Sequence, residues 1–325
     1  MAGIWTRLNN LGIAENKPFL ALAPLDGVTD FVFREIIAET AKPNVMFTEF
    51  TNTDALLSKG YDRTITRFRF LETQRPIVAQ IWGTKPESFL KVATMVCELG
   101  FDGIDINMGC PDRTVLKIGA GAGHINDHGI ASEIIAATKE GAKGLDVSVK
   151  TRIGINSIVT EEWASFLLTQ KLAALTVHGR TAKEMSKVAA HWDEIAKVVK
   201  LRDQISSETV ILGNGDITTR EQALQAHKEF GVDGVMIGRG IFLNPWIFET
   251  SPREHSVKVH LELLLKHTKL YCVTYTYKNS FEVMKKFFKI YVKNFNGAGN
   301  LKTELMRTSS YTEVENLVKP YLDVL

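Results

Sequence analysis

The segment Pro76–Gly109, PIVAQIWGTKPESFLKVATMVCELGFDGIDINMG, holds the pattern that decides the fold. Two short apolar runs, Pro76–Gly83 and Gly103–Gly109, stand on either side of a helical pattern at Pro86–Leu99. Continuous apolar runs of this length are typical of strands buried on both faces, as in a parallel sheet. The segment therefore predicts a strand–helix–strand unit whose two strands run in the same direction.

The same alternation continues on both sides of this segment. Further helical patterns occupy Ile130–Glu140, Thr160–Gln170 and Thr218–Phe230. Eight alternations over about 220 residues predict an α/β fold, a (β/α)8 TIM barrel. A doubly wound sheet is the alternative, but the barrel suits eight strands of this spacing better. The eight predicted strands are Phe19–Leu25, Val45–Phe50, Pro76–Gly83, Gly103–Gly109, Val147–Gly154, Leu172–Arg180, Thr209–Asp216 and Gly234–Gly240.

Most of these runs begin with apolar residues and end on polar residues or glycines. A TIM barrel places its active site at the carboxyl ends of its strands. We therefore expect the polar ends to converge on one rim and to form a functional site there. These strand ends carry Asp26, Glu49, Gln80, Asn107, Lys150, Arg152, His178, Arg180, Asn214, Asp216 and Arg239.

Only helical patterns follow Ser251, which predicts a second, all-helical domain. One predicted helix ends near Gly297, and another starts near Tyr311. We divide the chain into a catalytic barrel at residues 1–245 and a helical domain at residues 246–325. The apolar face of the first of these helices holds residues at helical spacing, namely Phe281, Met284, Phe288, Tyr291 and Phe295.

Positive charge is concentrated in this helical part. The whole chain has a net charge of +2, yet residues 251–325 contain 12 Lys and Arg against 7 Asp and Glu. A local excess of this kind indicates a polyanionic partner such as an RNA backbone. The lysines that lie off the apolar face are Lys278, Lys285, Lys286, Lys289 and Lys293.

Composition excludes several classes of protein. The chain has 325 residues, of which 45% are hydrophobic, so it can fill the core of a large domain and a smaller one. Its three cysteines have no CxxC or metal-ligand spacing, so we predict neither a disulfide framework nor a metal site. No apolar run approaches the roughly 18 residues of a membrane span, and no secretion signal is evident. We expect a cytoplasmic protein; a monomer is compatible with the sequence, which carries no signal for an oligomeric state.

Two glycine-rich turns end the last two predicted strands. They are Gly213-Asn214-Gly215-Asp216 and Gly238-Arg239-Gly240. Barrels often bind a phosphate at this position through backbone N–H groups. Glycines alone could serve only tight turns, but their pairing on adjacent strands favours a phosphate site, to which Arg239 adds a positive charge.

Lys150 and His178 end the fifth and sixth predicted strands. A lysine at this point can direct its ammonium group at a phosphate or an electron-rich ring. A neutral histidine can donate one hydrogen bond and accept another. Together with Gln80 they could hold a polar heterocycle, whereas a surface lysine and a structural histidine are the alternatives.

Cys110 follows a predicted strand directly and precedes Pro111, in a polar and glycine-rich segment. A free thiol has a pKa of roughly 8.5, so at neutral pH it can act as an acid, or as a nucleophile if it is activated. Cys97 and Cys272 lie in helical patterns typical of inert buried cysteines. Asn107 could reach the same pocket and bond a base edge.

The segment Gly119–His124, GAGAGH, follows the fourth predicted strand. Its alternating glycines predict a mobile loop over the site. A plain flexible connection is the alternative.

Seven blocks of this sequence resemble the tRNA-dihydrouridine synthases, in the order and at the spacing of that family. The resemblance runs from about residue 19 to the C-terminus. It departs from the family pattern at Leu25, where methionine is frequent, and at His124, where a small residue and leucines usually follow the glycines. The blocks are Ala23–Asp30 (APLDGVTD), Gln80, Asp105–Pro111 (DINMGCP), Lys150–Arg152 (KTR), Val177–Thr181 (VHGRT), Gly213–Asp216 (GNGD) and Gly238–Gly240 (GRG).

The resemblance implies an FMN-bearing barrel with a C-terminal helical domain. It implies an enzyme that reduces the C5–C6 double bond of specific tRNA uridines with electrons from NADPH. Cys110 would donate the proton to C5, while Asn107 and Arg152 would face the uracil. The residues implied to bind FMN are Pro24, Leu25, Asp26, Gln80, Lys150, His178, Asn214, Gly215, Asp216, Gly238 and Arg239.

Three other functions remain as alternatives. An FMN barrel acting on a free pyrimidine, like a dihydroorotate dehydrogenase, would not need a basic helical domain. An RNA-binding protein without catalysis would be expected to lack the cysteine, the lysine or the phosphate motif, and none is missing. A barrel lyase that uses Lys150 as an amine would be colourless, because it would carry no flavin.

Overall fold

Eight parallel strands close a barrel in the computed structural model, which describes residues 2–277 and 280–324. β1 (Phe19–Leu22) pairs with β2 (Val45–Phe47) on one side and with β9 (Gly234–Ile237) on the other. β2 also pairs with β4 (Ile77–Trp82), which completes the circle. The predicted TIM barrel is therefore confirmed. The other strands of the circle are β5 (Gly103–Met108), β6 (Val147–Arg152), β7 (Ala174–His178) and β8 (Val210–Asn214).

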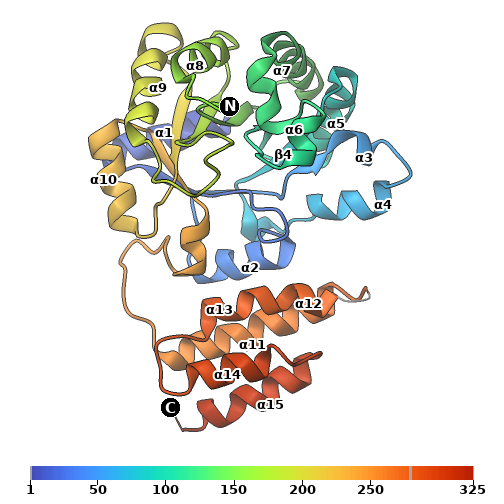
Figure 1. Ribbon diagram of the computed structural model, residues 1–325, viewed down its shortest axis with the longest axis vertical. Helices are drawn as coiled ribbons and strands as arrows, with labels where there is room; N and C mark the ends of the chain where they lie inside the picture. The colour runs from blue at the N-terminus through green and yellow to red at the C-terminus, as the bar shows by residue number, and fades with distance from the viewer. Residues whose placement is uncertain (1, 278–279, 325) are drawn as a thin grey trace.

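Helices between the strands form the outer layer of the barrel (Figure 1). The outward side chains of the strands, such as Ile104 and Ile106 on β5, are buried in the apolar core shared with these helices. The helices of this layer are α2 (Phe31–Thr40), α3 (Thr53–Leu56), α4 (Tyr61–Thr64), α5 (Pro86–Glu98), α6 (Arg113–Lys117), α7 (His128–Ala142), α8 (Thr160–Thr169), α9 (Trp192–Ile205) and α10 (Arg220–Phe230), with the 3-10 turns η1 (Ile65–Phe68), η2 (Glu72–Gln74), η3 (Gly121–Asn126) and η4 (Arg239–Phe242).

The amino-terminal end of the barrel is closed by α1 (Ile4–Glu15). Its residues Ile4, Trp5 and Leu8 are buried in a second apolar cluster with the inward side chains of the lower strand positions, including Phe19 and Phe47. The backbone N–H of Trp5 donates to the Asp146 carboxylate, which fixes the start of this helix. Because apolar side chains fill this end, the functional cavity opens at the other end.

The strands are shorter than predicted at their carboxyl ends. β1 ends at Leu22 and not at Leu25, and β7 ends at His178 and not at Arg180. The second predicted strand is interrupted after Phe47 and resumes as β3 (Thr51–Asn52), which pairs with β4. Several residues beyond the strand ends, such as Pro24, Gly83 and Arg180, stay buried although their backbone has left the ladder. The predicted strands therefore extended too far.

The C-terminal helices gather on one side of the barrel, next to α2 (Figure 1). The predicted helix start near Tyr311 is confirmed. The predicted helix through Phe295 is wrong in its end, because the helical backbone stops at Tyr291 and Asn294 takes a positive φ of 61°. Gly297 does not end that helix; it precedes the next one. The helices are α11 (Val257–Thr274), α12 (Ser280–Met284), η5 (Lys285–Phe287), α13 (Phe288–Tyr291), α14 (Ala298–Leu305) and α15 (Tyr311–Leu322).

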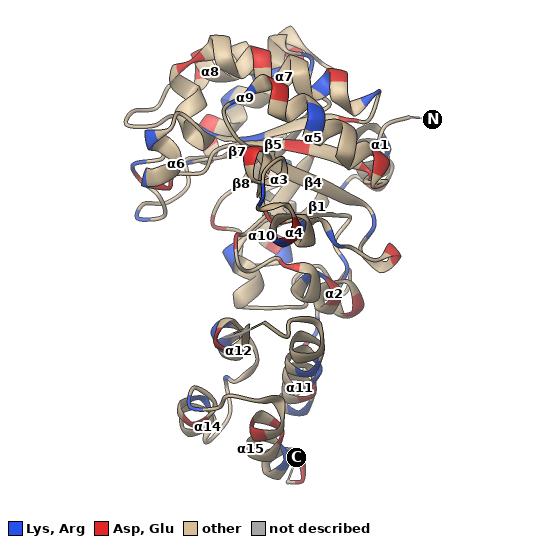
Figure 2. Cartoon of the chain, turned by 90° about the vertical axis from the view of Figure 1, so that its right-hand side faces the viewer, with Lys and Arg blue, Asp and Glu red and all other residues tan. Residues whose placement is uncertain are grey.

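Four of the five lysines that lie off the predicted apolar face contact other groups of the protein. Lys286 donates to the carbonyl of Gly27 on the barrel, and Lys293 donates to the carbonyl of Leu243. The Lys289 ammonium lies 4.8 Å from the ring centroid of Phe242, and the Lys285 ammonium pairs with Glu282 at 2.8 Å. Lys278 lies outside the described residues. Figure 2 shows residues of both charges on these helices.

A buried guanidinium organises the connection between β1 and α2, next to the helical domain. Arg34 is fully buried, and its Nη1 donates to the Thr29 carbonyl at 2.6 Å. Nη2 donates to the Arg69 carbonyl at 2.6 Å, and Nε donates to Gln74 Oε1 at 3.1 Å. The Asp30 carboxylate caps α2 by accepting from the Phe33 N–H at 2.8 Å. This network fixes the segment that leads from the rim into the first outer helix.

Candidate functional site

A cavity of about 520 Å³ lies at the carboxyl-terminal rim of the barrel. This volume falls within the range of roughly 300–1,000 Å³ that is typical of small-molecule and cofactor sites. Most residues predicted for the site line it, and the exceptions are Gln80 and Glu49. Those that line it include Pro24, Leu25, Asp26, Asn107, Cys110, Lys150, Arg152, His178, Asn214, Gly215, Asp216, Gly238 and Arg239.

Two acidic side chains shape the loop after β1. The Asp26 carboxylate pairs with Arg67 Nη1 at 2.6 Å. The Glu49 carboxylate accepts a hydrogen bond from the Gly27 N–H at 2.6 Å, and Gly27 has a positive φ of 64°. These contacts hold Pro24 and Leu25 against the cavity.

Lys150 and His178 lie on adjacent strands, β6 and β7, with their side chains at the cavity. Lys150 Nζ donates to Asn214 Oδ1 at 3.2 Å, and Asn214 Nδ2 donates to the Met236 carbonyl at 2.8 Å. Burial, together with a smaller effect of the neighbouring Arg152, lowers the pKa of Lys150 to about 8. Lys150 is therefore mostly protonated at neutral pH, but a small rise in pH is enough to remove its proton.

His178 is held as a neutral imidazole. Burial and the surrounding cations keep its pKa far below the ordinary value, because a positive ring would face Lys150, Arg152 and Arg180. Arg180 Nη1 lies 3.2 Å from His178 Nε2. Since a guanidinium only donates, Nε2 accepts and the ring proton lies on Nδ1.

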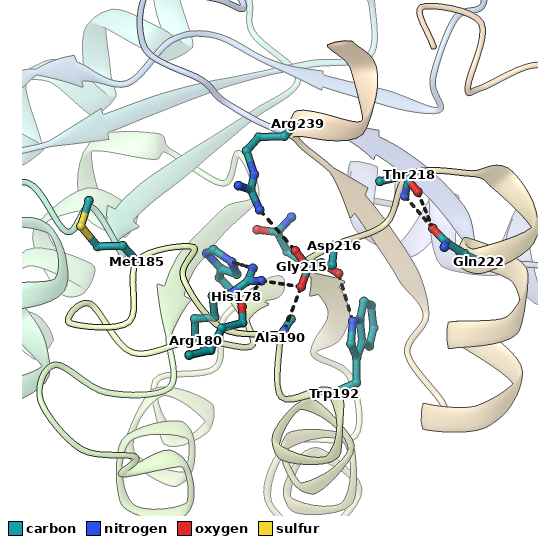
Figure 3. A network of polar contacts seen from close by, with 12 residues as sticks. His178, Arg180, Met185, Ala190, Trp192, Gly215, Asp216, Thr218, Gln222 and Arg239 are labelled. Atoms are coloured by element: carbon teal, nitrogen blue, oxygen red, sulfur yellow. Dashed lines mark hydrogen bonds and ion pairs between the residues drawn. The ribbon is translucent and has the colours of Figure 1, made fainter. Parts of the chain in front are cut away.

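Asp216 lines the cavity, and its carboxylate is engaged by other groups of the protein. Its carboxylate accepts from Arg180 Nη2, from Arg239 Nη2 at 3.2 Å and from the Ala190 N–H at 2.9 Å. Figure 3 shows both arginine side chains directed at this carboxylate. The Asp216 carboxylate therefore orients the guanidinium groups of Arg180 and Arg239.

The backbone around Cys110 is fixed on three sides. Asn107 Oδ1 accepts from the Cys110 N–H at 2.9 Å, and the Cys110 carbonyl accepts from the Ala122 N–H at 3.1 Å. Arg152 Nε donates to the Gly109 carbonyl at 2.8 Å. Burial raises the pKa of the Cys110 thiol, so it remains protonated at neutral pH. The site therefore presents a neutral thiol, which can act as a proton donor.

Gln80, which was predicted to contact the cofactor, is not among the residues that line the cavity. Its side chain is fully buried and lies between Asp105 and Asn107. In the ladder between β4 and β5, Gln80 pairs with Asp105, two residues before Asn107, so Gln80 lies deeper in the barrel than Asn107. Polar character at a strand end thus identified the residue as inward-facing, but not the depth at which it lies.

Arg152 lines the cavity, but its donors are largely engaged by protein. Besides Gly109, its Nη1 donates to the carbonyls of Thr181 at 3.0 Å and Met185 at 3.2 Å. The guanidinium therefore ties the Cys110 segment to the loop after β7. A contact to substrate would have to use its Nη2.

The predicted mobile loop at Gly119–His124 is packed instead. Ala120, Ala122 and His124 are buried, and the segment continues as the 3-10 turn η3 behind Cys110. His124 Nε2 lies 3.1 Å from the Gly83 carbonyl, and burial lowers the pKa of this ring. A Cβ at Gly121 would lie 2.9 Å from the Cys110 carbonyl oxygen, so glycine serves close packing here.

The model of the family described as dihydrouridine synthase (Dus) matches residues 21–324, from β1 to the end of the last helix. The chain belongs to the dihydrouridine synthase family. The match includes both the barrel and the helical domain, so the resemblance stated for the rim motifs extends over the whole fold.

Relatives of this dihydrouridine synthase family member are similar over nearly their full length. The probable tRNA-dihydrouridine synthase 2 of Bacillus subtilis (strain 168) is 45% identical over 94% of this chain and 96% of its own. The probable tRNA-dihydrouridine synthase of Staphylococcus aureus (strain MRSA252) is 45% identical over 94% of this chain and 93% of its own. Among solved structures, the old yellow enzyme homologue from Zymomonas mobilis is 15% identical, with a TM-score of 0.48, over 72% of this chain and 89% of that chain.

Arg180, one of the polar strand ends expected at the rim, is 2% exposed and lines the cavity of this dihydrouridine synthase family member, although it was not named as a cofactor-binding or substrate-binding residue. Phe50 and Ser186 also line the cavity, and no pattern in the sequence marks them.

No metal site was predicted, and the part of the chain that the structure describes contains no cluster of three or more His, Cys, Asp or Glu that could hold a metal ion. None of its helices is both long enough and apolar enough to span a bilayer.

Proposed function

We propose that this chain reduces the C5–C6 double bond of specific tRNA uridines to dihydrouridine, with FMN as cofactor and NADPH as electron donor. The observation that carries the proposal is the neutral Cys110 thiol at the rim of a cavity that also holds Lys150 and His178. Membership of the dihydrouridine synthase family supports the reaction, and the names of the two bacterial relatives support tRNA as the substrate.

The donor set of the cavity fits a flavin with a phosphate tail. Arg180 and Arg239 flank Gly215 and Gly238 at the end formed by β8 and β9. Two guanidinium groups beside glycine backbone suit a phosphate, because charge-assisted bonds and backbone N–H groups bind phosphate oxygens. Lys150 and the Nδ1–H of His178 would hold the polar edge of the ring, with Pro24 and Leu25 as its apolar wall.

Bound FMN would supply the hydride that adds to C6 of the uracil. The Cys110 thiol then gives its proton to C5, and a raised pKa keeps that proton in place until negative charge develops. The Lys150 ammonium stabilises negative charge near the ring system electrostatically. Arg152 and Asn107 hold the backbone of the Cys110 segment while this occurs.

A uridine in folded tRNA must leave its stack to enter this cavity, which costs a few kcal/mol. Contacts between the protein and the tRNA backbone offset that cost. The excess of Lys and Arg in residues 251–325 supports a role for the helical domain in these contacts, although its lysines at η5 and α13 also contact the barrel.

The decisive test is an assay of the purified protein with tRNA that lacks dihydrouridine. We expect a yellow protein that releases FMN on denaturation and that forms dihydrouridine when NADPH is supplied. A colourless protein would contradict the flavin assignment. Activity on free uracil or orotate with none on tRNA would instead support the free-pyrimidine alternative.

Arg239→Ala is expected to weaken FMN binding by roughly 10- to 100-fold, because a charge-assisted hydrogen bond to the phosphate is lost. The Arg239 side chain is 60% exposed and paired only with Asp216 among the residues that the structure describes, so the fold should be unaffected.

Titration with FMN and with riboflavin measures the effect of Arg239→Ala on binding. Riboflavin, which lacks the phosphate, should bind both proteins equally. Arg253→Ala, at an exposed arginine of the linker, is the matched control; an unchanged FMN affinity in Arg239→Ala would refute the phosphate role.

The rate of flavin reduction by NADPH is expected to fall as the pH rises through 8. The lowered pKa of Lys150 means that its ammonium dominates below about 8 and is lost above it. Well above this pKa, the charged fraction falls about tenfold for each pH unit. Lys150→Arg should remove this alkaline limb, because a guanidinium stays charged. A wild-type rate that is constant to pH 9.5 would show that the ammonium charge is not used.

A further inference from the structure

A carboxylate lies inside the barrel beneath Cys110, and nothing in the proposed reaction uses it. Side chains of β5 alternate, so that Asp105 and Asn107 point inward while Ile104 and Ile106 join the outer core. Asp105 is fully buried. Burial of a carboxylate is costly unless hydrogen bonds compensate for it, so its presence at this position calls for a function.

Asp105 begins a chain of hydrogen bonds that ends on the Cys110 backbone. Ser148 Oγ donates to its Oδ1 at 2.6 Å, and Gln80 Nε2 donates to its Oδ2 at 2.7 Å. Asn107 Nδ2 donates to Gln80 Oε1 at 3.0 Å. Asn107 Oδ1 accepts from the Cys110 N–H at 2.9 Å. Three consecutive side chains therefore connect the barrel interior with the proton donor.

The carboxylate determines which way the two amides of this chain are turned. A carboxamide donates from one end and accepts at the other, and either end can occupy either place. An ionised carboxylate only accepts, so the Gln80 NH₂ group must face Asp105 and its oxygen must face Asn107. The Asn107 NH₂ group must then face Gln80, which leaves the Asn107 oxygen for the Cys110 N–H. Burial raises the pKa of Asp105 to about 6, so the group is ionised at pH 7 to 8.

We propose that Asp105 is a positioning residue for Cys110, which acts by fixing the orientation of the Gln80 and Asn107 amides. This role rests on the proposed function only in so far as Cys110 is the proton donor. Without an acceptor at position 105, the Gln80 amide is free to turn, and its NH₂ group then opposes that of Asn107. An Asn107 amide turned in response presents NH₂ to the Cys110 N–H. The Cys110 segment then loses one of the three contacts that fix its backbone at the cavity.

Asp105→Leu and Asp105→Asn separate orientation from simple filling of space. Leucine has the branched shape of aspartate, with bulkier methyl groups in place of the oxygens, and offers no acceptor. Asparagine keeps an oxygen for Gln80 and turns its NH₂ group to the Ser148 hydroxyl, which can accept. We expect Asp105→Leu to lower uridine reduction by roughly 10- to 100-fold, since a small misplacement of a reacting group has effects of this size. Asp105→Asn should recover most of that loss. Reduction of bound flavin by NADPH should change equally in both variants, because both remove the negative charge that raises the pKa of Lys150.

Alkylation of Cys110 by iodoacetamide gives a readout that does not depend on substrate. Cys97 and Cys272, which are partly accessible like Cys110, serve as internal controls in the same mass spectrum. In Asp105→Leu we expect Cys110 to react about fivefold faster relative to these two, the equivalent of one lost hydrogen bond. Asp105→Asn should react like the wild type.

A third variant protects the test against misfolding. Gln80→Met interrupts the same chain of hydrogen bonds at its second side chain and leaves Asp105 bonded to Ser148. It therefore tests the proposal even if Asp105→Leu yields no folded protein. It should show the same faster alkylation. Wild-type alkylation in folded Asp105→Leu or Gln80→Met, or equal behaviour of Asp105→Asn and Asp105→Leu, would overturn the positioning role. If the wild type itself reduces no tRNA uridine, the proposed function fails, while the alkylation ratio still reports on Asp105.

Discussion

Cys110→Ala is expected to lower the rate of uridine reduction by roughly 100- to 10,000-fold, the usual range for loss of a general acid. Among the described residues, Cys110 is the only cysteine that lines the cavity, so no other thiol can replace it there. Burial raises its pKa and keeps it protonated. The variant should still bind FMN and accept electrons from NADPH, because the groups that surround the predicted flavin site are unchanged. Enzyme reduced in advance and mixed with tRNA under anaerobic conditions isolates the affected step.

Cys272→Ala is the matched control for this experiment. Cys272 is also a partly accessible free cysteine, but it lies on α11 in the helical domain. Its removal should leave both half-reactions at wild-type rates. Near-normal uridine reduction in Cys110→Ala would assign the proton to another donor, whereas a parallel loss of flavin reduction would indicate a structural defect.

Arg34→Met is expected to have the largest effect on stability, a loss of about 3–5 kcal/mol. The guanidinium is fully buried and satisfies two backbone carbonyls and Gln74, and its charge favours the ionised form of Asp30. Methionine preserves much of the volume but leaves these acceptors without a donor. Burial already raises the pKa of Asp30 to about 7, so this carboxyl can take up a proton and relieve part of the cost.

Urea denaturation of Arg34→Met, followed by circular dichroism, measures this loss as a lower midpoint. Arg63→Met on α4 is the control, because that side chain is exposed and its removal should change stability by no more than about 0.5 kcal/mol. Equal midpoints for the two variants would contradict the structural role of Arg34. Since its partners hold the β1–α2 connection, a partially unfolded variant should also bind FMN weakly.

The alternation of strands and helices was enough to predict the barrel, and polar strand ends were enough to predict its rim. The period-two pattern shows which residues face inward, but not where the backbone leaves the ladder. For this reason β1 was predicted to run three residues too far, and Gln80 was placed at the cavity although it lies beneath it. Depth along a strand depends on the register between neighbouring strands, which a single sequence does not contain.

Long-range contacts likewise could not be predicted from the sequence. The glycines at 119–123 predict mobility when considered alone, yet they pack closely behind Cys110 and His124 bonds the Gly83 carbonyl. Helical periodicity predicted that the lysines of the helical domain lie off its apolar face. Periodicity distinguishes an apolar face from a polar one, but it does not distinguish solvent from a neighbouring domain, as Lys286 and Lys293 show.

The pairing of β1 with β9 also has a consequence for synthesis on the ribosome. β1 is made among the first residues of the chain, but its partner at Gly234–Ile237 follows more than 200 residues later. At roughly 5–20 residues per second, β1 waits about 10 to 40 s with one edge unpaired. An unpaired edge is a template for association with other chains, so this interval is when the nascent protein most needs protection by chaperones.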